Sequence, residues 1–425
     1  MTPRSTRIAG LLTMLLPMAS QAQSLQQTVL AALAHYPAIV SSQYKTRAAQ
    51  ADITRAQGAH WPQLSWSGTY NDYQSSTLSD RWIQTPVLSL NLWSGGRIAS
   101  DIERAKALSQ ASQLQEHLTR DEVALLSSEA YLQWAHHSHM TSLAEENLAA
   151  HEKILRDFQT ISQVDSGRRI DLSQAQVRYE NARIAVIRSQ TDMRVSGERV
   201  SRMLMAPAPA APSGLDSTPG VPFTTLDQAR TRLNDQHPAI ARLLAQCEAA
   251  RASIRYAQAQ SAPTVNLTHS KSVVPGLAQG QFVTQLQLNL PLFDGGSARG
   301  AVGVESANLQ ALQADLAEMR LLLQEQLSAS WTSWQQSRIR ADMGQAQVHT
   351  AQILARGYEL QFRAGRRSLL DLLNIQSDLF TYQSNAATAA HEARLSQGRV
   401  LAHLGQLAQA YETATPRSAS VKVTE

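Results

Sequence analysis

Two pairs of short alternating segments, each followed by a very long helical stretch, constrain this chain most strongly. The segments span 64–73 and 84–93, and again 264–273 and 282–291. In the last of these, Leu286, Leu288 and Leu290 alternate with polar residues, the period of a strand with one apolar face. Helix breakers are scarce over 297–356, and an uninterrupted helix of roughly 60 residues would measure about 90 Å. Such a helix needs partner helices along its length.

The second long stretch has the apolar spacing of a coiled coil. Its apolar residues recur at alternating spacings of three and four, as in a heptad repeat. After Leu323 the spacing is one residue longer than the heptad requires, and the apolar series then continues. These apolar residues are Leu309, Leu312, Leu316, Met319 and Leu323, followed by Leu327, Trp331 and Trp334. We therefore predict that this face packs against neighbouring helices.

The chain reads as one unit of about 200 residues that has been duplicated. LSLNLWSGG at 88–96 recurs as LNLPLFDGG at 288–296, and GRRIDLSQAQ at 167–176 recurs as GRRSLLDLLNIQ at 365–376. A Pro- and Ala-rich stretch separates the copies and is typical of a linker. The predicted organisation is a first repeat over 23–205, a linker over 206–222, a second repeat over 223–411 and a flexible tail over 412–425.

Residues 1–22 have the pattern of a secretory signal. Arg4 and Arg7 precede a short apolar core, and small residues follow it. The net charge is +4, and the Lys and Arg residues are dispersed, so we expect no nucleic-acid partner. Cys247 is the only cysteine, which excludes an intramolecular disulfide and a multi-cysteine metal site. The mature chain is expected to be exported.

The alternating segments have the length that a tilted strand needs to cross a bilayer, about ten residues. Alternation alone also describes an ordinary half-buried sheet, but export and the long helices favour strands in a membrane. Four strands cannot close a barrel, and an open sheet edge is not tolerated in lipid. Several chains must therefore pool their strands around a symmetry axis, with the polar faces lining a lumen.

The ends of the predicted strands are marked by glycine and proline. Double glycines allow the backbone to turn from strand into helix, and no phosphate-loop motif surrounds them. Ser94 or Asp294 can cap the helix that follows. The predicted strand–helix junctions are Gly95, Gly96, Gly295 and Gly296, and the predicted helix–strand junctions are Pro37, Pro62, Pro238 and Pro263.

The duplicated layout, the junction LxLxxPLFDGG at 286–296 and the turn FRAGRRSLLDLLNIQSDL at 362–379 together resemble the TolC family of outer-membrane efflux proteins. The resemblance implies a mainly α fold with a transmembrane β part. Four strands per chain would contribute to a trimeric twelve-stranded β-barrel in outer-membrane lipid, continued by a long helical barrel in the periplasm. It implies a non-enzymatic channel without cofactors. Its partners would be a periplasmic adaptor and an inner-membrane ABC or RND pump.

The resemblance also implies a periplasmic gate at the two helical turns. By position, Asp371 matches an acidic ring, and Asn374 stands where a second aspartate often lies. Arg367 and Asp171 match a closing charge pair between neighbouring helix pairs. Phe362 occupies a place where a tyrosine hydroxyl commonly contributes. Three Asp371 carboxylates around one axis would make the pore cation-selective and pH-sensitive. Both aspartates could instead only cap their helices.

The sequence leaves the cargo undetermined, and two other classes of protein have to be considered, a soluble adaptor and an enzyme. Trp93 in LNLWSGGRI, together with the absence of a lipidation cysteine after the signal, favours type I protein secretion over multidrug or metal efflux. A soluble periplasmic coiled-coil adaptor would share the export signal and the heptads but not the strands. An enzyme lacks support, because His136, His137 and His139 point to different helix faces and no pattern completes a metal site.

Overall fold

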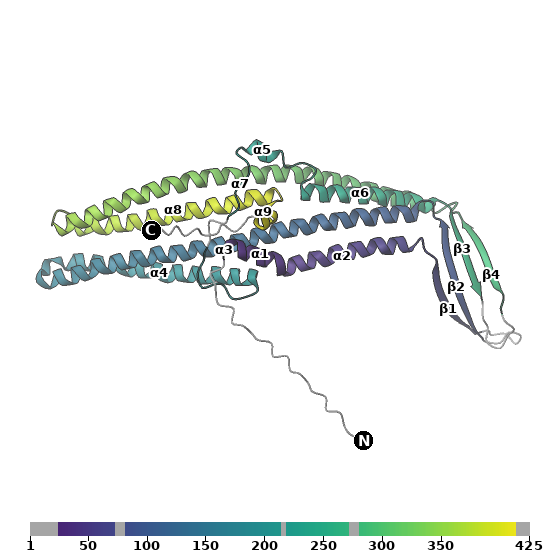
Figure 1. Ribbon diagram of the computed structural model, residues 1–425, viewed down its shortest axis with the longest axis horizontal. Helices are drawn as coiled ribbons and strands as arrows, with labels where there is room; N and C mark the ends of the chain where they lie inside the picture. The colour runs from purple at the N-terminus through teal and green to yellow at the C-terminus, as the bar shows by residue number, and fades with distance from the viewer. Residues whose placement is uncertain (1–23, 73–80, 214–217, 272–279, 414–425) are drawn as a thin grey trace, which may run out of the picture. The chain divides into compact units, whose positions relative to one another are not determined.

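The computed structural model describes residues 24–72, 81–213, 218–271 and 280–413, so the expected signal segment lies outside the described residues. One order of elements occurs twice (Figure 1). The first copy contains α2 (Pro37–Gly58), β1 (Gln63–Asn71), β2 (Arg81–Trp93), α3 (Arg97–Val164), η1 (Ser166–Arg168) and α4 (Arg169–Leu204). The second contains α6 (Pro238–Gln258), η3 (Ala259–Ser261), β3 (Thr264–Lys271), β4 (Phe282–Asn289), α7 (Ser297–Arg363) and α8 (Leu369–His403). The short helices α1 (Leu25–His35), α5 (Leu226–Arg230) and α9 (Leu407–Thr413) lie outside this repeated order.

The chain divides into two compact units, and each unit draws on both copies. Of the described residues, unit one comprises 24–28, 130–213, 218 and 345–388, and unit two comprises 29–72, 81–129, 219–271, 280–344 and 389–413. The two repeats follow one another along the sequence, whereas each compact unit is built from parts of both repeats. In the described part of the chain, no helix is both long enough and apolar enough to span a membrane.

The predicted apolar seam of α7 is confirmed by burial within unit two. Leu316 and Leu323 pack with Ile240 and Leu243 of α6 in one apolar cluster. A second cluster follows one turn later and joins α7 to the end of α8. It contains Leu327, Trp331, Trp334, Val400 and Leu404. Leu309, Leu312 and Met319 are half-buried, so the whole seam faces neighbouring elements.

The four predicted strands are confirmed and form one antiparallel sheet in the order β1-β2-β3-β4 (Figure 1). Strand β2 begins three residues before the predicted 84–93. Residues 73 and 272–273 of the predicted segments lie outside the described residues. Strand β4 ends at Asn289, before Pro291, which has no N–H to donate to a ladder.

The register of the sheet places most leucines on one face and most amide and hydroxyl side chains on the other. Leu267 lies opposite both Leu90 and Leu286, so these three residues share one face. Their neighbours Asn91 and Asn266 pair on the other face, where Asn91 Nδ2 donates to Asn266 Oδ1 at 2.7 Å. This polar face also carries Ser65, Ser67, Ser89, Thr268, Gln285 and Gln287. The sheet is therefore two-sided, with a leucine face and a polar face.

The outer strands of the sheet, β1 and β4, have no strand partner on their free edges within the described chain. Every residue of β4 is exposed, and so is every residue of β1 except Asn71. An unpaired edge of this length offers a row of free backbone N–H and C=O groups to another strand.

The four prolines divide into two kinds. Pro62 and Pro263 directly precede β1 and β3, at helix–strand junctions. Pro37 and Pro238 are the first residues of α2 and α6, so their assignment to helix–strand junctions is wrong. Proline suits the first helical position because its fixed φ is helical and its missing N–H has no partner there.

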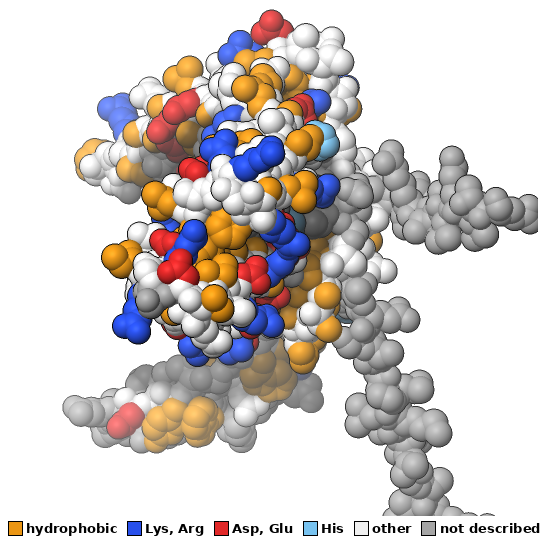
Figure 2. All heavy atoms as spheres, turned by 90° about the vertical axis from the view of Figure 1, so that its left-hand side faces the viewer, with side chains coloured by type: hydrophobic (Ala, Val, Ile, Leu, Met, Phe, Trp, Pro, Cys, Tyr) orange, Lys and Arg blue, Asp and Glu red, His pale blue; other side chains and the backbone are white. Residues whose placement is uncertain are grey.

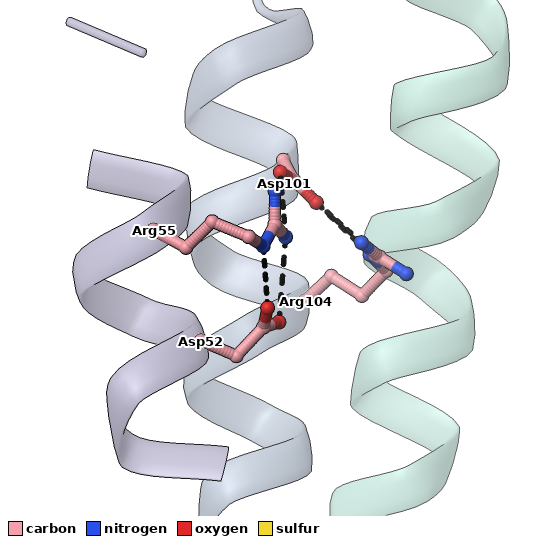
Figure 3. A network of polar contacts seen from close by, with 4 residues as sticks. All are labelled: Asp52, Arg55, Asp101 and Arg104. Atoms are coloured by element: carbon pink, nitrogen blue, oxygen red, sulfur yellow. Dashed lines mark hydrogen bonds and ion pairs between the residues drawn. The ribbon is translucent and has the colours of Figure 1, made fainter. Parts of the chain in front are cut away.

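An ion-pair network joins α2 to α3 in unit two (Figure 3). Arg55 Nε lies 2.5 Å from Asp52, and its Nη2 lies 3.4 Å from Asp101 on α3. Arg104 contacts the same Asp101 at 2.5 Å, so this carboxylate accepts from two arginines. The arginines of the network are solvent-accessible while Asp101 is half-buried, and pairs near the surface contribute about 0–1 kcal/mol each.

Helix α9 is attached to α3 through a buried carboxylate. Asp121 Oδ1 accepts a hydrogen bond from the backbone N–H of Ala408 at 2.8 Å. Burial raises the pKa of Asp121 to about 6, and hydrogen bonds from the first turn of α9 oppose that rise. Arg120 and Glu412 form an exposed ion pair between the same two helices.

Asp121→Asn is expected to raise the free energy of unfolding by about 2 kcal/mol at neutral pH, because an amide keeps an acceptor for Ala408 without burying a charge. The folded-state pKa lies above the ordinary 3.8. The stability contributed by the neutral carboxyl is therefore complete below pH 3.8 and is lost as the pH rises through about 6. Thermal unfolding followed by circular dichroism should show the variant's advantage disappearing towards acidic pH. An advantage independent of pH would contradict this role.

Candidate functional site

The turn between α7 and α8 lies in unit one and contains most of the predicted gate residues. Helix α7 ends at Arg363, and Gly365 then adopts φ +70°, a left-handed conformation that favours glycine. Its N–H donates to Phe362 O at 2.9 Å, and the N–H of Arg366 donates to Gln361 O at 2.8 Å. These bonds satisfy the last carbonyls of α7 and reverse the chain into α8.

Asp371 lies in the first turn of α8 and forms a reciprocal cap with Ser368. Ser368 donates to Asp371 Oδ2 through its hydroxyl at 2.8 Å and its N–H at 3.3 Å, while the N–H of Asp371 donates to Ser368 Oγ at 3.2 Å. These bonds, and then the charge of Arg367, lower the pKa of Asp371. The carboxylate is therefore ionised at neutral pH while it caps the helix.

Arg367 contacts residues of α7 and α8 next to its own turn. Its Nε donates to Gln361 Oε1 at 3.0 Å, and its guanidinium carbon lies 4.2 Å from the centre of the Tyr358 ring. Its Nη1 lies 3.8 Å from Asp371 Oδ2. Tyr358, one turn before Phe362 on α7, was not predicted as a partner of Arg367.

Asp171 occupies the first turn of α4, at the other turn of unit one. Its Oδ2 lies 3.7 Å from Arg168 Nη1, an exposed pair within the turn. Among the described residues of the single chain, no ion pair joins Asp171 to Arg367. The predicted closing pair between neighbouring helix pairs is therefore not formed within the single chain, and each of its members has a local partner that it must leave.

Asn374 and Phe362 connect the two helix pairs of unit one. Arg178 of α4 donates to Asn374 Oδ1 at 3.4 Å, which places a cation where the acidic ring was expected to be incomplete. Phe362 packs against Phe158 of α3, with ring centres 5.6 Å apart. Around them lies an apolar cluster of Ile154, Leu155, Phe158, Ala175, Leu369, Leu372, Leu373 and Ile375.

The surface at this end carries charges of both signs. Lys153 Nζ lies 2.7 Å from Glu359 Oε1 between α3 and α7. Figure 2 looks onto the end that carries both turns and shows blue and red side chains intermixed with orange ones. The turns therefore offer single charged groups in defined positions rather than a patch of one sign.

The strand–helix junctions are built alike in the two copies but packed differently. Gly95, Gly96, Gly295 and Gly296 all have φ between +62° and +89°. A Cβ at Gly95 would lie 2.2 Å from Ala262 Cβ, whereas a Cβ at Gly295 would meet nothing within 4 Å. In each copy the preceding residue caps the helix: Ser94 Oγ accepts from Ile98 N, and Asp294 accepts from Gly296 N and Ala298 N.

On α3, the rings of His136 and His137 have centres 5.5 Å apart. His137 contacts Gln133 through Nε2 at 2.6 Å, and burial lowers the pKa of His136 to about 4. Among the described residues, no three His, Cys, Asp or Glu side chains are placed to hold a metal ion.

Comparison with known proteins gives one family and a consistent set of relatives. The family described as "Outer membrane efflux protein" matches residues 29–204 and 230–406. The chain is 22% identical to outer membrane efflux protein BepC of Brucella suis, over 93% of this chain and 88% of BepC. It is 24% identical to protein CyaE of Bordetella pertussis, over 88% of this chain and 82% of CyaE. The Campylobacter jejuni CmeC outer membrane channel shares the fold, with a TM-score of 0.79 at 14% identity over 90% of this chain and 86% of CmeC.

Proposed function

Because this chain belongs to the outer membrane efflux protein family, we propose that three copies form one export channel, which receives cargo from an inner-membrane pump. Members of this family are outer membrane channels of tripartite systems and not enzymes. The chain is accordingly an outer membrane protein. This excludes the alternative class, a soluble periplasmic coiled-coil adaptor, which the heptad spacing alone did not exclude.

The observation that supports this assembly is the two-sided sheet with two free edges. In lipid, each free N–H and C=O would cost several kcal/mol, so β1 of one copy must pair with β4 of the next. Three copies would close a twelve-stranded barrel with the leucines outward and the amide and hydroxyl side chains towards the lumen. The same closure would place the helices of the three copies around one axis.

An exposed apolar stripe on α4 supports the contact between copies. Ile170, Val177 and Ile184 follow one another at intervals of seven residues and are 73%, 60% and 62% exposed. Seven-residue spacing is the repeat of a coiled-coil seam, and a seam needs a partner helix. A helix of a neighbouring copy would cover this stripe and leave the adjacent turns facing the axis.

We place the periplasmic gate at the two turns of unit one. Three copies would bring Asp371 into an acidic ring, with Asn374 one turn further along α8 and Phe362 on α7 in the apolar layer behind it. In the closed state, Arg367 of one helix pair would reach Asp171 of the neighbouring pair. Docking of the periplasmic adaptor would break these contacts and open the pore.

For the cargo, we propose type I protein secretion, in which the pump is an ABC transporter. The supporting observation is Trp93 at the end of β2, where the second copy has Phe293. The competing candidate is small-molecule or metal efflux through an RND pump, and the name of BepC as an efflux protein favours it. Crosslinking in native membranes followed by purification distinguishes the two. Recovery of an RND pump in place of an ABC transporter would overturn the secretion proposal.

The channel itself is tested with the purified full chain. We expect sarkosyl-insoluble outer-membrane fractionation, a trimer on unheated gels that collapses to a monomer on boiling, and discrete conductance steps in planar bilayers. The ring of Asp371 carboxylates should make the current cation-selective, and Asp371→Asn should reduce this selectivity. A monomeric protein that produces no current would refute the assignment.

A further inference from the structure

The apolar face of the sheet ends, on the side away from the helices, in a cluster of aromatic and basic side chains. Lys271 lies opposite Phe282, and its Nζ is 4.7 Å from the centre of the Phe282 ring. His269 stacks on the same ring with centres 5.2 Å apart and planes 10° apart. His269 Nδ1 also lies 2.8 Å from Thr284 Oγ1. The ammonium group is thus held against an aromatic ring by a cation–π contact and not by a carboxylate.

On the same face of the sheet, the leucines lie nearer the helices, and exposed aromatic side chains lie nearer this cluster. Pairing places Leu267 beside Leu90 and Leu286, and places His269 and Lys271 further along the same face. Trp66, Trp82, Tyr70 and Phe282 are each more than half exposed. Exposed aromatic side chains beside an aliphatic band are typical of the boundary between hydrocarbon and headgroups.

The charge on the strands is of one sign. The strand sequences contain no Asp or Glu, and their basic residues are Arg81, His269 and Lys271. Lys271 has no acidic neighbour on any of the four strands. Within the sheet, its ammonium group therefore contacts the Phe282 ring rather than a carboxylate.

We propose that Lys271 and His269, positioned by the Phe282 ring, bind the phosphate of a phosphorylated glycolipid of the outer leaflet, with its acyl chains along Leu267 and Leu286. This inference rests on the proposed function, which puts the sheet in the outer membrane and the helices in the periplasm. The strand ends remote from the helices then face outward, where the lipid is a phosphorylated diglucosamine. Phospholipid headgroups lie at the opposite ends of the strands.

The test is native mass spectrometry of the purified full chain with bisphosphorylated lipid A, dephosphorylated lipid A or phosphatidylglycerol. We expect the bisphosphorylated lipid to be retained most strongly. Lys271→Gln should weaken its binding about fivefold, the factor for one basic residue at an anionic surface. Phe282→Leu should weaken it in the same direction, and Lys271→Arg should preserve it. Lys45→Gln, an exposed lysine of α2, serves as the matched control.

Equal binding of the dephosphorylated lipid, or unchanged binding by Lys271→Gln, would overturn the inference. Equal binding of phosphatidylglycerol would overturn the assignment to the glycolipid. Conductance of the same preparations distinguishes failure of the lipid-binding inference from failure of the proposed channel function. If the wild type conducts without discriminating the lipids, only this inference fails, whereas absence of any current would refute the channel.

Discussion

Replacing Asp171 with Asn and Arg367 with Gln together is expected to shift the channel towards its open state by roughly a hundredfold. The two side chains are proposed to pair between neighbouring helix pairs, and a threefold assembly has three such contacts. At roughly 1 kcal/mol each, the three contacts would stabilise the closed state relative to the open state by about 3 kcal/mol. The measurement is the single-channel conductance and open fraction in planar bilayers.

The structure supplies the matched control for this experiment. Arg366 lies beside Arg367 in the same turn, so Arg366→Gln removes the same charge without removing the proposed pair. Arg168→Gln frees Asp171 from its local partner at 3.7 Å and should leave the closed state at least as stable. Unchanged conductance in the double variant, or an equal increase in Arg366→Gln, would refute the gate assignment.

Gly95→Ala is expected to be the most damaging single substitution at a strand–helix junction. A side chain at φ +62° costs about 1–2 kcal/mol, and the contact with Ala262 adds about 1–3 kcal/mol of overpacking. The loss should appear as a smaller fraction of heat-modifiable trimer and a lower thermal midpoint.

The second copy provides a control for the Gly95 substitution. Gly295 has φ +69°, but a Cβ at this residue would have no neighbour within 4 Å, so Gly295→Ala should cost only the backbone strain. Gly58→Ala, in helix α2 with open space around it, should be neutral or slightly stabilising. Equal losses at Gly95 and Gly295 would show that Ala262 does not restrict the junction.

The strands and the α7 seam could be predicted because their signals are local. Leu286 and Leu288 alternate with polar residues, and Leu316 and Leu323 are seven residues apart, so a single element determines which face each side chain occupies. Proline was less informative. Pro37 and Pro62 look alike in sequence, yet one begins a helix and the other precedes a strand, because proline is compatible with both positions.

At the turns of unit one, the sequence predicted the acidic position but not its partners. Asp371 lies three residues after Ser368, and the structure forms the cap that this spacing allows. Tyr358 was not predicted as a partner of Arg367. Their contact depends on how the chain folds back after Gly365, which no residue spacing specifies.

The sequence by itself determined the two-sided strands, the heptad face and the duplicated order of elements, because each follows from spacings within one segment or from similarity between segments. Only the tertiary structure decided that both copies contribute to each compact unit. It also decided that Gly95 contacts Ala262 while Gly295 has no such neighbour, and that Lys271 lies over Phe282. These features are distances between residues from different elements, and nearly identical local motifs can differ in them.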